Sequence, residues 1–312
     1  MARIKRLCVF LKERFPIPYA LLGVMSFLAV YWGFFAVDGL ARVSYSWSAL
    51  VGTVSVVLMM LLMRIYDELK DVDTDIRLGA AGDPRFVNRP IVTGAVRKED
   101  IVFLRWLVTA GLFIINFGLI GTPALPAFLI LFFIGWLSYQ WFFIPAISRN
   151  ILLALVTHNP LVLLQSLYIY SIYYIDSPSS EISAWHMIMI VGLWMPFAIW
   201  ETARKIRVPE EESEYETYSS KLGLNKAVAM PFVFTVISVT CLVVFSNMAS
   251  LPYWFVLLVV GGGGVMLLRC VLLWVAPTRR RSELRPFGET YMLIVNIGVI
   301  SAVLSAKELI LI

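Results

Sequence analysis

The sequence is dominated by a series of nine apolar segments, each about as long as a bilayer is thick. They comprise residues 17–37, 47–66, 101–121, 123–145, 151–173, 184–203, 226–246, 254–275 and 290–311. An α-helix needs about 20 apolar residues to cross the hydrocarbon core of a bilayer. The sequence therefore predicts an all-α membrane protein. We expect residues 1–312 to form a single integral membrane domain, in which residues 17–311 make a bundle of nine transmembrane helices.

The composition excludes several other classes of protein. Of the 312 residues, 60% are hydrophobic and 15% are charged, whereas soluble domains are nearer half apolar and about a quarter charged. A soluble enzyme and a disordered chain are therefore excluded. Cys8, Cys241 and Cys270 are far apart, which argues against a disulfide framework or a Cys/His metal site. The net charge of +5 indicates membrane topology and anionic ligands, not nucleic acid.

The basic residues lie in alternate connections between the apolar segments. The N-terminal tail and the connections after the second, fourth, sixth and eighth segments carry most of them, whereas the other connections hold only Arg42, with Lys307 near the end of the last segment. Cytoplasmic loops are enriched in Lys and Arg. We therefore expect a cytoplasmic N-terminus and an active face on the cytoplasmic side, in the plasma membrane if the chain is prokaryotic. Residues 1–15, with an apolar stripe among basic residues, predict a short interfacial helix.

A row of carboxylates follows the second apolar segment. Asp67, Asp71 and Asp75 are spaced four residues apart, so on a helix they share one face, with Glu68 beside them and Asp73 facing away. Like charges at this spacing repel each other, and a hard divalent cation such as Mg²⁺ would relieve the repulsion. Because Mg²⁺ completes its shell with water and substrate phosphates, the row predicts a Mg²⁺–diphosphate site. The alternative is a solvated acidic helix end.

The segment after this row carries candidate phosphate ligands. Residues 82–94 are rich in Pro and Gly, which predicts a loop, and they contain Arg85 and Arg89. Arginine forks suit phosphate oxygens, although either arginine alone is also typical of a cytoplasmic loop.

A later segment, residues 200–223, holds a second group of acids and bases. We consider Glu201, Glu210 and Glu211 as ligands of a second Mg²⁺, and we consider the bases Arg204, Lys205 and Lys221 as diphosphate ligands. The alternative for Glu201 is simple pairing with Lys205, four residues away.

These motifs resemble those of the UbiA superfamily of intramembrane prenyltransferases. The family signature NDxxDxxxD resembles Asp67-Glu68-x-x-Asp71-x-x-x-Asp75, and its RPLxxG loop end resembles Arg89-Pro90-Ile91-Val92-Thr93-Gly94. The second signature, DxxxD followed by a Lys-Ser/Thr stretch, is matched only in its last part, Tyr218-Ser219-Ser220-Lys221-Leu222-Gly223. The expected aspartates are absent, and Glu210 and Glu211 lie nearest the second of them. Tyr139 and Arg149 resemble the family's Tyr and basic position between the fourth and fifth helices.

The resemblance implies a nine-helix UbiA-type bundle with a central cavity that opens to lipid. It also implies two Mg²⁺ ions that bridge a prenyl diphosphate donor, with Asp71, Asp75 and Glu210 as catalytic residues. The expected activity is Mg²⁺-dependent transfer of a polyprenyl group to an aromatic or other lipophilic acceptor. Two alternatives remain open: a UbiA-type terpene cyclase that uses the same diphosphate site, and a transporter with acidic gates. A product that contains an acceptor distinguishes transferase from cyclase, and Mg²⁺-dependent diphosphate release distinguishes both from a transporter.

Two polar positions interrupt the apolar segments. His158-Asn159-Pro160 lies inside residues 151–173. Polar groups within a span are candidate functional groups, and Asn159 is then a candidate for orienting the acceptor. The alternative is a proline kink whose freed backbone groups bond to neighbours. His186, near the outer end of residues 184–203, is expected at the membrane interface.

Overall fold

The computed structural model describes residues 2–141, 143–148, 150–178, 181–212 and 217–311. In chain order, its elements are α1 (Arg3–Arg14), α2 (Ile17–Val37), β1 (Arg42–Tyr45), α3 (Trp47–Ala80), α4 (Lys98–Phe117), α5 (Ala124–Trp141), α6 (Pro145–Ser148), α7 (Ile151–His158), α8 (Leu161–Asp176), α9 (Ala184–Ala203), η1 (Pro209–Glu211), α10 (Tyr218–Leu222), α11 (Leu224–Met248), α12 (Tyr253–Val275), α13 (Arg279–Ser282), α14 (Arg285–Ala306) and β2 (Glu308–Leu311). Within these residues, nine helical stretches are long and apolar enough to cross a membrane. The predicted all-α membrane fold is confirmed.

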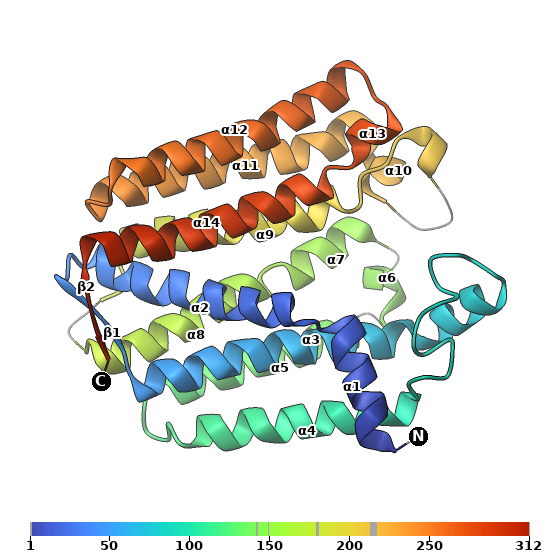
Figure 1. Ribbon diagram of the computed structural model, residues 1–312, viewed down its shortest axis with the longest axis horizontal. Coiled ribbons are helices and arrows are strands. Elements are labelled where there is room, and N and C mark those ends of the chain that lie inside the picture. The colour runs from blue at the N-terminus through green and yellow to red at the C-terminus, as the bar shows by residue number, and fades with distance from the viewer. Residues whose placement is uncertain (1, 142, 149, 179–180, 213–216, 312) are drawn as a thin grey trace.

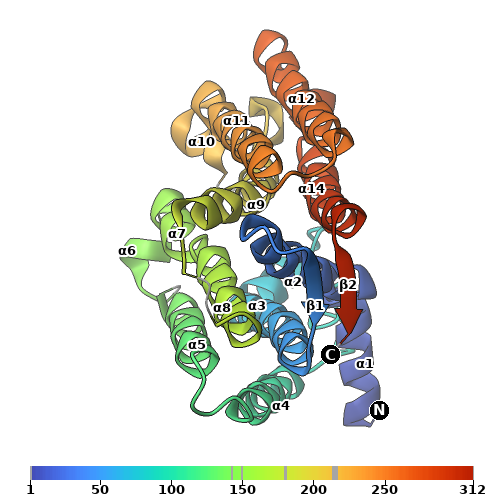
Figure 2. The ribbon, with the colours of Figure 1, turned by 90° about the vertical axis from the view of Figure 1, so that its left-hand side faces the viewer.

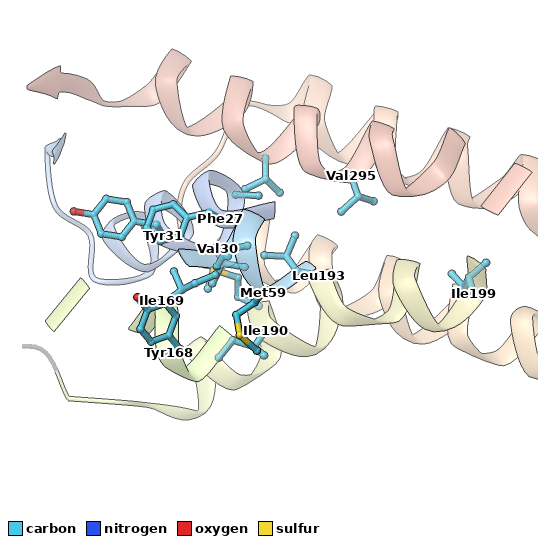
Figure 3. Close-up of a cluster of buried hydrophobic side chains, with 14 of the residues drawn as sticks. Phe27, Val30, Tyr31, Met59, Tyr168, Ile169, Ile190, Leu193, Ile199 and Val295 are labelled. Carbon is cyan, nitrogen blue, oxygen red and sulfur yellow. The ribbon is translucent and has the colours of Figure 1, made fainter. Parts of the chain in front are cut away.

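The long helices lie roughly side by side, and α2 is central among them (Figures 1 and 2). It packs against α3, α8, α9 and α14. Residues 29–36 of α2 are all buried, which means that this part of the helix is covered on every side. Figure 3 shows this core, in which Phe27 and Tyr31 of α2 meet Met59 of α3 and residues of α8, α9 and α14. An apolar helix buried all round is typical of the interior of a bundle.

The basic segments gather at one end of the bundle. Helix α1, the connection between α3 and α4, and helices α10 and α13 all lie at the right-hand end in Figure 1. The opposite end carries strands β1 and β2, which pair in parallel from Arg42 with Glu308 to Tyr45 with Leu311. The connections that we expected on one side of the membrane are therefore on one side of the molecule.

The last apolar segment differs from its predicted extent of residues 290–311. Helix α14 begins earlier, at Arg285, and ends at Ala306. Its 22 residues already span about 33 Å, the thickness of a bilayer core. The chain beyond Lys307 is therefore beyond the core, and its backbone groups pair with β1 instead of continuing the helix.

The fifth apolar segment is broken, as a proline inside it allows. Helix α7 ends at His158, and α8 begins at Leu161 after Pro160. The side chains at the break bond to neighbouring helices. His158 Nε2 lies 2.9 Å from the carbonyl oxygen of Ser138 on α5, and Trp194 of α9 donates its Nε1–H to Asn159 Oδ1. These bonds satisfy polar groups that would otherwise face apolar surroundings.

A buried polar group joins three helices within the core. Asn116 of α4 donates to Ser55 Oγ of α3 at 2.8 Å and accepts from the Tyr168 hydroxyl of α8 at 2.7 Å. Asn116 is fully buried. Loss of its amide leaves the other two groups without this partner, and buried polar groups without partners are costly.

We therefore expect Asn116→Ala to lower the free energy of unfolding by about 1 to 3 kcal/mol. Thermal unfolding in detergent micelles measures this. Tyr168→Phe is the matched control, because it removes the hydroxyl but leaves the bond between Asn116 and Ser55 in place, and we expect it to cost less. Equal stability of Asn116→Ala and the unchanged protein would contradict the role of this network.

Candidate functional site

Three carboxylates line the last turns of α3. The helix has 34 residues and is about 50 Å long, so it extends well beyond an apolar core of ~30 Å. Asp67 and Asp71 are about half exposed, at 48% and 47%, and Lys70 lies between them at 3.5 and 3.7 Å. Asp73 is 91% exposed, as expected for a residue that faces away from the row.

Asp75 is the buried end of the row. Its side chain is 3% exposed and forms an ion pair with Arg89, whose guanidinium lies 4.2 Å from the centre of the Phe86 ring. The loop after α3 folds back along the helix, because Val92 packs directly against Gly79, where a Cβ would lie 2.4 Å from the Val92 side chain. This close approach brings an arginine 14 residues later in the chain to Asp75.

Arg85 has a different environment from Arg89. It is 59% exposed and donates from Nη2 to Asp83 at 2.7 Å. Hydrogen bonds from the side chain and then the backbone N–H of Arg85 lower the pKa of Asp83 to about 2. Asp83 therefore stays ionised over the physiological range and holds Arg85 at the outer edge of the loop.

Glu68 is buried away from the row. Its side chain is 6% exposed and pairs with Arg14 of α1 at 2.5 Å and with Arg64 on the preceding turn of α3. Helix α1 is fixed at a second point, because Arg6 bonds to Asp100 of α4 at 2.5 and 2.8 Å. In the described structure, Glu68 therefore attaches the N-terminal helix to α3.

The second charged segment begins on the last turn of α9. Arg204 binds both carboxylate oxygens of Glu201, at 2.7 and 2.8 Å, and Lys205 Nζ lies 3.3 Å from the same group. Glu201 is only 16% exposed. The pairing of Glu201 with Lys205 that the sequence left open is therefore present, and Arg204 joins it.

The other described carboxylates of this segment, Glu210, Glu211 and Glu212, lie on or beside η1. Glu211 accepts from Ser282 Oγ at 2.6 Å and pairs with Arg279 at 3.2 Å, which joins η1 to α13. Glu212 accepts from Thr217 and Ser219, both at 2.7 Å. Glu210 is exposed.

An open pocket of about 280 Å³ lies beside these groups. It is lined by Arg207, Pro209, Glu212, Ser219, Ser220, Gly223 and Leu224. Lys221 lies on α10 next to these residues and is exposed.

Several candidates come from helices between the two charged segments. Tyr139 of α5 stacks on Tyr66, with ring centres 4.5 Å apart, and Tyr66 directly precedes Asp67. His158 of α7 has its Nε2 at 2.9 Å from the carbonyl oxygen of Ser138, the residue before Tyr139. Helix α7 is therefore close to the acidic row, and Asn159 connects it to α9 through Trp194. Arg149 lies outside the described residues.

The interfacial position expected for His186 stays a prediction. Its side chain is 1% exposed, with Nε2 at 3.1 Å from Asp38 at the end of α2. Asp38 also accepts from the Tyr173 hydroxyl of α8. These groups form a buried polar cluster at the end of the bundle opposite the acidic row. Sequence reasoning missed this cluster because the partners come from three helices that only the fold brings together.

The two charged segments differ in their fit to Mg²⁺. Among the described residues, no group of three or more His, Cys, Asp and Glu side chains is arranged to hold a metal ion. Mg²⁺ needs only one or two protein carboxylates, with water and phosphate completing its shell. Asp67 and Asp71, half exposed on one face, fit this requirement. Glu201 and Glu211 do not fit it, because protein donors already engage them.

Comparison with known proteins agrees with the family that the sequence motifs resemble. The model of the UbiA prenyltransferase family matches residues 26–296. One similar solved structure is described as digeranylgeranylglyceryl phosphate synthase in membranes, with a TM-score of 0.62, 12% identity, and coverage of 96% of this chain and 99% of that chain. Another is a UbiA homologue from Aeropyrum pernix K1, with a TM-score of 0.61, 16% identity, and coverage of 89% and 97%. No curated protein matches the sequence.

The burial of Glu68 gives a test that separates its role from that of the row. We expect Glu68→Gln to lower the free energy of unfolding by about 2 kcal/mol, because two arginines lose a charged partner. Asp67→Asn is the matched control, and since Asp67 is half exposed we expect little change in stability. Thermal unfolding of both variants in detergent measures the difference. Equal melting temperatures would contradict an anchoring role for Glu68.

Proposed function

The chain belongs to the UbiA prenyltransferase family, and on that premise we propose that it is a Mg²⁺-dependent prenyltransferase. It would move a polyprenyl group from an allylic diphosphate to an aromatic or other lipophilic acceptor within the bilayer. The basic end of the bundle would face the cytoplasm, as the distribution of Lys and Arg favours. The observation that carries the proposal is the row of Asp67, Asp71 and Asp75 at the end of α3, with Arg89 against it.

In this proposal, Asp67 and Asp71 are the principal ligands of Mg²⁺, which would supply a Lewis acid at the leaving diphosphate oxygens. Asp75 is predicted to complete the row. Its ion pair holds Arg89 beside the carboxylates, where a guanidinium can bind phosphate oxygens. Arg204, Lys205 and Lys221 are proposed as further diphosphate ligands, and Arg85 and Arg149 as ligands nearer the edge of the site.

The reaction breaks the allylic C–O bond of the donor, and the electron pair leaves with the diphosphate. The carbon that remains is an electrophile, which joins a carbon or oxygen of the acceptor as the acceptor loses a proton. Arginine and lysine side chains stabilise the leaving anion by charge. Apolar and aromatic walls exclude water and protect the electrophile from hydrolysis. We propose that the stacked Tyr66 and Tyr139 form part of such a wall next to the acidic row.

Product analysis tests the activity. Purified protein with Mg²⁺ is incubated with labelled prenyl diphosphates, first without acceptor and then with a membrane-lipid and phenolic extract. Glyceryl phosphate lipids are included, because the name of one structural neighbour points to them. Label that moves only when an acceptor is present supports a transferase. A cyclic hydrocarbon or alcohol formed without acceptor would make the chain a cyclase, and no diphosphate release by folded protein would point to transport.

The acidic row gives the first mutational prediction. We expect Asp71→Ala or Asp75→Ala to abolish diphosphate release while the protein stays folded, because each removes a carboxylate from the row. Asp73→Ala is the matched control, since it removes a carboxylate from the same helix on its exposed side. Release is measured by phosphate detection, and folding by thermal unfolding. Turnover equal to that of the unchanged protein in both row variants would end the metal-site proposal.

Arg89 gives the second mutational prediction. We expect Arg89→Ala mainly to raise the KM for the prenyl donor, by about tenfold or more, because one charge-assisted contact to phosphate is worth about 1.5 to 3 kcal/mol. Arg77→Ala, an exposed arginine on α3, is the comparison variant. Steady-state kinetics over a range of donor concentrations separate KM from kcat. An unchanged KM would reduce Arg89 to a topological and structural role.

A further inference from the structure

The end of α9 carries its own cations where a metal site would need open carboxylates. Glu201 has Arg204 on both of its oxygens and Lys205 at 3.3 Å. Two cations and one carboxylate leave this group with a net charge of +1. A divalent cation placed against Glu201 would have to displace Arg204 and would be repelled by Lys205.

The contrast with α3 is clear because the spacing is the same. Asp67 and Asp71 are four residues apart on one helix, and so are Glu201 and Lys205. On α3 the two positions are both carboxylates, each about half exposed. On α9 they are a carboxylate and an ammonium group in contact. With Lys70 between them at 3.5 and 3.7 Å, the two carboxylates of α3 keep a net charge of −1, whereas the group on α9 has a net charge of +1. The end of α3 is therefore the one that attracts a further cation.

Among the described residues, the neighbouring carboxylates do not replace the missing ligand. Glu211 is engaged by Ser282 and Arg279, and these contacts hold η1 against α13. Glu212 is engaged by two hydroxyl donors. Each of these groups serves the connection between α9 and α11, and Glu210 alone on the exposed η1 turn does not make a site.

We propose that this chain binds one divalent ion, on α3, and that Arg204 and Lys205 take the place of a second ion. They act as fixed cations that bind the diphosphate from the α9 side. This inference rests on the proposed function, because it assigns the two halves of the same diphosphate site. It is proposed in place of the expectation that Glu201, Glu210 and Glu211 hold a second Mg²⁺.

Counting bound metal tests the inference without any turnover. Mn²⁺ replaces Mg²⁺ as the probe, and electron paramagnetic resonance measures the free and bound ion over a titration of purified full-length protein. The titration is run with and without an unreactive alkyl diphosphate. We expect one Mn²⁺ per chain in both conditions, retained by Glu201→Gln and lost by Asp71→Ala.

A gain of function sharpens the test. Lys205→Asp creates two carboxylates four residues apart on α9, and we expect this variant to bind a second Mn²⁺. Lys221→Asp is the matched control, since it changes the same charge on α10, and we expect it to keep one ion. Two ions bound by the unchanged protein, with one lost in Glu201→Gln, would overturn the inference. So would the absence of any bound ion.

The two proposals can fail separately. One bound ion without diphosphate release would leave the metal count standing and end the proposed activity. Diphosphate release by a chain that binds two ions would support the proposed activity and overturn the metal count. Thermal unfolding of each variant shows whether a lost ion reflects a lost fold.

Discussion

The site depends on the length of α3. At 34 residues this helix is longer than a bilayer core is thick, so its apolar part can lie in lipid while its last turns reach water. A shorter helix would place the acidic row in the hydrocarbon region, where each ionised carboxylate costs several kcal/mol. A kinked helix would point Asp67 and Asp71 away from α7. Because the row continues an unbroken helix, the packing of α3 against α2, α4 and α8 fixes the direction in which its carboxylates point.

Charge compensation then decides which carboxylates remain accessible. Each buried acid at this end has a cation from another segment: Glu68 has Arg14, and Asp75 has Arg89. These pairs tie α1 and the loop after α3 to the helix, because a buried carboxylate without its partner would be strongly destabilising. In the described part of the chain, Asp67 and Asp71 share the more distant Lys70. The same principle that stabilises the end of the bundle thus leaves two of four carboxylates open to a ligand.

The parts of the fold that depend on local patterns could be predicted from the sequence. Hydropathy gave the nine spans, and the four-residue spacing placed Asp67, Asp71 and Asp75 on one helix face. What the sequence could not provide was burial and partnership, which depend on contacts between distant segments. Glu68 differs from Asp67 by one position, yet it is buried and paired with Arg14 of α1. His186 is buried beside Asp38 of α2, a partner that the sequence did not indicate. The end of α14 was misplaced because Leu309 and Leu311 are apolar and continue its hydropathy, while their backbone pairs with β1.

In the proposed site, the charged ends of α3 and α9 would contribute to anion binding in different ways. A metal ion on α3 would be exchangeable, so its charge at the site depends on the concentration of the ion and on the presence of a phosphate to complete its shell. The positive charges of Arg204 and Lys205 on α9 are permanent. Glu201 holds both side chains in position, and its carboxylate offsets part of their charge. A diphosphate bridging the two ends would therefore meet preorganised charge on one side and bring about ion binding on the other. In such an arrangement, the affinity for the metal ion and the affinity for the diphosphate donor depend on each other through α3 alone. The cations on α9 are in place whether or not the metal ion or the donor is bound.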